Sequence, residues 1–172
     1  MRHPRPVRVP AQDPLATRAT QGPRAASLAR LTVFNPTRDE VRRFFTEAWR
    51  KHREQLPLVG LETVAVDVLR AHPEYHPALE AADVAEREFS VESGETNPFL
   101  HLSLHLAIEE QLSIDQPPGL RAAFERIATR TGDRHEAQHA LLECLGETVW
   151  RSQREGTPPD ALAYLDCVQR KA

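Results

Sequence analysis

Residues 97–114, NPFLHLSLHLAIEEQLSI, form the stretch that decides the fold. Asn97 followed by Pro98 is typical of a helix start, because asparagine caps a helix N-terminus and proline suits the first helical position. Apolar residues then cover nearly the whole circumference of the predicted helix. A helix that is apolar on all sides is buried. The stretch therefore predicts a buried helix that ends near Ile114.

Helical signals continue on both sides of this stretch. Asn35-Pro36 repeats the cap chemistry and starts a helix that should end near Leu56-Pro57. Apolar spacing predicts the remaining helices over 61–71, 77–89, 120–130, 134–155 and 161–168. No run alternates with period two for long enough to suggest a strand. The sequence predicts an all-α protein, an irregular bundle of about six helices in a single domain spanning 33–172.

Residues 1–31 differ in composition from the rest of the chain. They contain six arginines, one acid and few apolar residues at any period, and the first 23 residues include five prolines. This composition predicts a disordered basic tail. The tail carries a net charge of +5, which leaves −8 for the rest of a chain whose total is −3. A body with that charge is a poor candidate for binding nucleic acid.

Composition also argues against several other classes of protein. No apolar run has the roughly 18 residues of a membrane span, and no secretory signal is present. Neither of the glycine-rich phosphate-binding motifs occurs, and no serine has the setting of a hydrolase nucleophile. The two cysteines, Cys144 and Cys167, form no C-x-x-C motif and no disulfide framework. This predicts a reducing, cytoplasmic location.

One spacing of histidines and carboxylates occurs in two of the predicted helices. Both read H-x3-H-x3-E, and a further H-x3-H pair lies in a proline-rich segment before them. Residues four apart share one helical face, so each trio forms a stripe. The candidate metal ligands, in chain order, are His72, His76, His101, His105, Glu109, His135, His139 and Glu143.

Buried ionisable side chains are costly unless they are paired or coordinated, which leaves two explanations for the stripes. In the first, they bind one or two transition-metal ions, and mixed imidazole and carboxylate ligands suit iron, manganese or zinc. His101 and Glu109 lie about 12 Å apart along the helix and cannot share an ion. In the second, neutral histidines donate hydrogen bonds to the glutamates without metal.

These explanations lead to two functional hypotheses. The first is a helical-bundle metalloprotein whose reaction is unknown. The second is a non-catalytic interaction or scaffold protein with a buried His–Glu hydrogen-bond network, for which a homo-oligomer is one expected form. A set of ring nitrogens that face one common centre favours the metal, and rings that face separate backbone carbonyls favour the network.

Several segments resemble an uncharacterised bacterial family, the domain of unknown function numbered 1841. They are VFNPTRDEVRRFF (33–45), HPEYH (72–76), NPFLHLSLH (97–105), IEEQ (108–111), IDQP (114–117), HEAQH (135–139) and ECLGE (143–147). The resemblance covers about 33–168. It implies a small bacterial cytosolic protein and supplies no activity. Because members of the family begin near Phe34, it also implies that 1–31 is a lineage-specific extension or follows a misplaced start codon.

In chemistry and fold class the chain is also loosely similar to haemerythrin-like and ferritin-like helical metal proteins. A ferritin-like site needs two Glu-x-x-His motifs. Only Glu136-Ala-Gln-His139 has that spacing here. The similarity implies a metal site within a helical bundle and no particular reaction.

Overall fold

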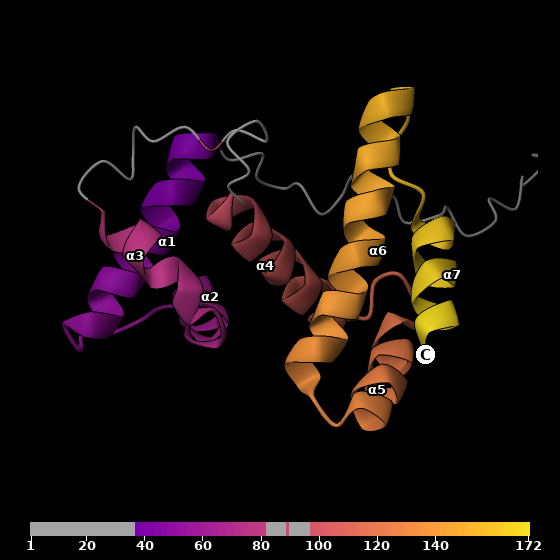
Figure 1. Cartoon of the computed structure of the whole chain (residues 1–172), viewed down its shortest axis with the longest axis horizontal. Coiled ribbons are helices and arrows are strands. Elements are labelled where there is room, and N and C mark those ends of the chain that lie inside the picture. The colour runs from indigo at the N-terminus through magenta and orange to yellow at the C-terminus, as the bar shows by residue number, and fades with distance from the viewer. Residues whose placement is uncertain (1–36, 82–88, 90–96) are drawn as a thin grey trace, which may run out of the picture.

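The described part of the chain is entirely helical and loop. The computed structural model describes residues 37–81, Phe89 and 97–172, and within these ranges it contains seven α-helices, one 3-10 helix and no strand (Figure 1). The elements are α1 (Arg38–Arg53), α2 (Leu61–Ala71), the 3-10 helix η2 (Pro73–Tyr75), α3 (His76–Glu80), α4 (Pro98–Ile114), α5 (Leu120–Thr131), α6 (Arg134–Glu155) and α7 (Ala161–Lys171). The predicted all-α class is confirmed.

Local capping chemistry sets most of the helix boundaries. The side chain of Asn97 accepts hydrogen bonds from two backbone amides at the start of α4, and Asp133 and Asp160 do the same for α6 and α7. Helix α1 begins at Arg38 with a capping box between Thr37 and Glu40. Its cap is therefore Thr37, and the prediction of Asn35 as the cap was wrong. Gly132 ends α5 in the left-handed conformation that glycine adopts without strain.

Some predictions lie outside the described residues. These are the tail over 1–31, the residues Asn35-Pro36 themselves and residues 82–88 of the 77–89 helix. Within the described residues, α3 ends at Glu80 because Ala81 is extended, so this helix does not run unbroken to residue 89 as predicted. The single-domain boundary, 33–172, also remains a prediction.

The apolar core forms two clusters that meet along α4. The first cluster joins α1, α2 and α3 to the N-terminal half of α4 and includes Phe45, Leu69 and Leu102. The second joins the C-terminal half of α4 to α5, α6 and α7 and includes Ile108 and Phe124. Figure 1 shows α4 between these two groups of helices. Its central residues therefore lie where the two clusters meet.

The burial predicted for α4 holds along one face of the helix but not all the way round it. Leu102, His105 and Ile108 are completely buried. Leu100 is 60% exposed and Ile114 is 54% exposed. The prediction of an all-round buried helix was therefore too broad, because no described helix covers these two side chains.

The two cysteines form a disulfide, so the prediction of no disulfide framework was wrong. Cys144 in α6 is bonded to Cys167 in α7, and their Cα atoms lie 5.9 Å apart. Cys144 is buried in the second cluster beside residues such as Tyr164 and Val168. The two residues are 23 positions apart in sequence and meet only because α7 packs back on α6. The argument for a reducing compartment from cysteine usage therefore no longer holds.

None of the helices within residues 37–81 and 97–172 combines the length and the apolar character that crossing a membrane requires.

We predict that reducing the disulfide destabilises the protein. Releasing a loop of this length gives the unfolded chain more conformational freedom and should lower the free energy of unfolding by about 3 kcal/mol. Urea denaturation with and without a reducing agent measures the difference. A Cys144→Ala/Cys167→Ala double variant is the control, since the reducing agent should leave it unchanged. Equal stability of the native protein under both conditions would contradict the prediction.

Candidate metal centre

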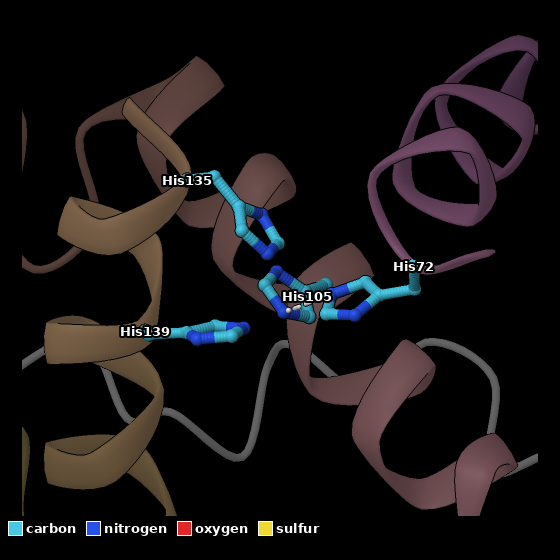
Figure 2. Close-up of side chains that lie close together, drawn as sticks. All are labelled: His72, His105, His135 and His139. Carbon is cyan, nitrogen blue, oxygen red and sulfur yellow. Dashed lines mark hydrogen bonds between the residues drawn. The ribbon is translucent and has the colours of Figure 1, made fainter. Parts of the chain in front are cut away.

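Four histidines from three elements face one another where the two clusters meet. His72 ends α2, His105 lies in the middle of α4, and His135 and His139 lie in the first two turns of α6. One ring nitrogen from each of the four lies within 4.8 Å of the others. Figure 2 shows their rings directed at a common centre. We call these four residues the histidine cluster.

A fifth histidine lies beside the histidine cluster. The Nε2 atom of His105 is 3.0 Å from Nε2 of His72 and 3.1 Å from Nε2 of His101. His101 is half-buried one helical turn before His105. The two histidines of each predicted H-x3-H-x3-E stripe therefore lie in the histidine cluster or directly beside it.

Local structure explains how each helix presents its histidines. His101 and His105 are four residues apart on α4 and share one face. The Asp133 side chain accepts a hydrogen bond from the backbone amide of His135 and so fixes the first turn of α6. His72 follows the last turn of α2, where its backbone amide donates to the carbonyl oxygen of Leu69.

Glu74 orients the ring of His72. Its Oε1 atom lies 2.7 Å from His72 Nδ1. Burial raises the pKa of the Glu74 carboxyl, but the hydrogen bond with His72, a backbone hydrogen bond and the nearby His72 and His101 rings together keep that pKa below its ordinary value. The ionised carboxylate only accepts, so Nδ1 carries the proton and donates. In the neutral ring, the lone pair of His72 is then on Nε2, which faces the histidine cluster.

The surroundings favour the neutral form of the buried imidazoles. Burial, followed by repulsion from the neighbouring histidines, lowers the pKa of His105 to about 3 and that of His101 to about 4. Burial and the same neighbours also lower the pKa of His139. At neutral pH, these rings each have a nitrogen lone pair available for a metal ion.

Two buried ring nitrogens have no hydrogen-bond partner among the described residues. They are Nδ1 of His105 and Nε2 of His139. A buried polar atom without a partner costs free energy, so such atoms in a folded protein call for an explanation. A metal ion bound at the centre would provide a partner for a ring nitrogen that faces it, and would explain why that nitrogen has no hydrogen bond.

Two of the predicted ligands lie away from the histidine cluster. The Nε2 atom of His76 donates to the carbonyl oxygen of Leu69 at 2.8 Å, and its ring stacks on Trp49 with the centroids 4.0 Å apart. Glu143 is 69% exposed and pairs with Lys171 at 2.6 Å. Eight residues of α-helix turn about 80° past whole turns, so the third member of a stripe drifts off the face of the first. Neither His76 nor Glu143 is therefore retained as a ligand.

Glu109 lies near the histidine cluster but is bound to other groups. Its carboxylate accepts a hydrogen bond from Nε2 of Gln138 and lies 3.7 Å from the guanidinium of Arg134. It lines a cavity of about 380 Å³ together with His105 and His135. The structure thus places it one turn beyond the centre, as a neighbour of the four rings.

Sequence reasoning missed Glu74 and Gln138. Glu74 had a signal, because it lies two residues after a candidate ligand in the HPEYH segment. Gln138 had none, because nothing in the sequence shows that α6 brings its amide to Glu109.

We predict that the metal-free protein loses stability below about pH 6.5. Imidazoles of the unfolded chain bind protons near that pH, whereas His101 and His105 in the folded protein resist protonation until about pH 4 and about pH 3. The unfolded state therefore binds more protons in this window, and the free energy of unfolding falls as the pH decreases. Urea denaturation in the presence of a chelator, at several values between about pH 7.5 and about pH 5, measures this free energy of unfolding. The range is suitable because most carboxyl groups titrate below it.

A His105→Leu variant is the comparison for this prediction. It lacks the most strongly perturbed imidazole, so its stability should fall less steeply over the same range. A native protein whose stability stays constant or increases toward about pH 5 would contradict the assignment of neutral buried rings.

The comparisons with known proteins identify the family without assigning a function. Searches of curated proteins and of solved structures found no significant match, so the similarity to haemerythrin-like and ferritin-like proteins is not supported. A family model, described as a domain of unknown function, matches residues 37–170. This match covers more than three quarters of the chain and includes all members of the histidine cluster. The chain therefore belongs to the DUF1841 family.

Proposed function

We propose that this protein binds one transition-metal ion through His72, His105, His135 and His139. The observation that carries the proposal is the convergence of four ring nitrogens, from three separate elements, within 4.8 Å of one another. The sequence left one or two ions open. A single shared centre favours one ion.

The dimensions and the donor type support this proposal. Four nitrogens at 2.0–2.1 Å from a tetrahedral zinc ion lie about 3.3 Å apart. The nitrogens here need only small side-chain movements to reach that spacing. Imidazole ligands suit zinc and iron, whereas manganese prefers carboxylates. With no carboxylate in the cluster, the proposal favours zinc or iron over manganese.

The surroundings resemble those of metal-bound histidines. A ligating imidazole usually donates its other N–H to a carboxylate or a carbonyl, which fixes the tautomer. Glu74 makes this contact with His72. The ion would lie between the two hydrophobic clusters and connect α4 to both α6 and the end of α2.

The alternative His–Glu network has less support. It requires the glutamates of the stripes to accept hydrogen bonds from the histidines. Instead, Glu109 pairs with Gln138 and Glu143 pairs with Lys171. The network also leaves buried nitrogens of His105 and His139 without partners. These contacts favour the metal.

We expect the purified protein to contain about one equivalent of metal, and added Zn²⁺ or Fe²⁺ to raise its Tm, because binding to the native state stabilises it. His105→Ala and His139→Ala should abolish both effects. Glu143→Gln and His76→Gln are matched controls that should retain one equivalent. Mass spectrometry and thermal denaturation measure the outcome. Metal below about 0.1 equivalent, with no change of Tm, would refute the proposal.

Glu74→Gln should weaken metal binding by about 10- to 100-fold, because an amide orients His72 less firmly and does not increase its basicity. Titration against a chelator of known affinity measures the loss. Glu110→Gln, an exposed carboxylate change on α4, is the control and should leave the affinity unchanged. Recovery of affinity in Glu74→Asp would show that the carboxylate itself is needed. Equal affinities of Glu74→Gln and the native protein would rule out the positioning role.

A further inference from the structure

One side of the histidine cluster opens into a cavity. The space between α2, α4 and α6 has a volume of about 380 Å³, and its wall includes His105 and His135. Val64, Val68 and Ala71 of α2 form the apolar part of that wall. His101 is not part of it, so this side of the centre is not covered by the fifth imidazole. An ion held by the four histidines would therefore be exposed toward the cavity.

The charges around the centre favour an anion at that exposed position. Four neutral imidazoles bring no negative charge to a divalent ion, and the single carboxylate of Glu74 on His72 offsets only part of its charge. His72 and His105 are almost completely buried, so water screens this charge weakly. A bound ion is then the largest local charge, and an anionic ligand lowers the cost of burying it.

Three charged side chains line the cavity, and they should act on such a ligand in opposite directions: Arg134 attracts it, whereas Glu109 and the exposed Asp67 repel it. The side chain of Arg134 is 58% exposed and lies in the wall of the cavity beside His135. The carboxylate of Glu109 lies deeper and is 27% exposed. Arg134 therefore attracts a small anion, and Glu109 limits how strongly it is held.

We propose that this cavity is the entrance to an open coordination position on the metal, and that it admits a small monoanion as an exchangeable ligand. This inference rests on the proposed metal site. Zinc bound by four ligands can expand to a fifth, and iron accepts six. The valine wall restricts the ligand to a small molecule. The metal site is then a binding or reaction centre rather than a closed structural one.

Cobalt(II) and azide provide the test. The protein is loaded with Co²⁺, and its visible absorption spectrum is recorded while azide is added. We expect a saturable spectral change, because an added ligand alters the coordination of Co²⁺. Val64→Trp fills the cavity and should weaken azide binding by at least tenfold. Thr63→Trp places the same side chain on the exposed face of α2 and should bind azide as the native protein does.

The two charge variants test the electrostatic part of the proposal. Arg134→Gln should weaken azide binding a few-fold, and Glu109→Gln should strengthen it by a similar factor. Both variants should retain stoichiometric Co²⁺. Effects in these opposite directions would support the cavity as the route of the anion.

The outcomes of these experiments distinguish failure of the anion site from failure of the metal site on which it depends. If Co²⁺ does not bind, the metal site itself is refuted, and the anion site with it. If Co²⁺ binds but azide leaves the spectrum unchanged, only the open position is refuted. Azide binding that appears only in Glu109→Gln would show that Glu109 occupies the position. Azide binding that Val64→Trp does not weaken would overturn the cavity as the entrance.

Discussion

The fold depends on how buried imidazole rings are accommodated where two hydrophobic clusters meet. A buried ring must either hydrogen-bond through both nitrogens or give one lone pair to an ion. His105 is completely buried, and its Nε2 atom lies within hydrogen-bond distance of two other imidazoles while its Nδ1 atom has no partner in the described structure. The apolar residues on either side hold these rings close together, whether or not the rings satisfy one another's hydrogen bonds. The packing of the two clusters thus brings ring nitrogens close together, and a metal ion bound between them would accept their lone pairs.

The helices were predictable because their signals are local. Helix α2 has the predicted range, the Asn97 cap begins α4 as expected, and α6 begins and ends at the predicted residues. A cap or a helical period depends on residues a few positions apart. The disulfide was not predictable, because Cys144 and Cys167 meet only through the packing of two helices.

The candidate site was predictable only in part. Spacing of four correctly placed His101 with His105 and His135 with His139, since such pairs share a helical face. It failed for Glu143, which the drift of the helix carries into solvent. The histidines of the HPEYH segment were also ambiguous, because only the turn after α2 decides which ring faces inward. That turn sends His72 to the centre and His76 onto Trp49.

The position of α4 also has a consequence for the order in which the structure forms. The first cluster draws on residues 41–106 and the second on residues 104–172, so each is nearly continuous in sequence. Cores built from such local contacts form rapidly and can open independently as cooperative units. His72 belongs to one unit, and His135 and His139 belong to the other. The complete ligand set exists only while both units are formed and docked on α4, so an ion in that set would make the two units unfold as one.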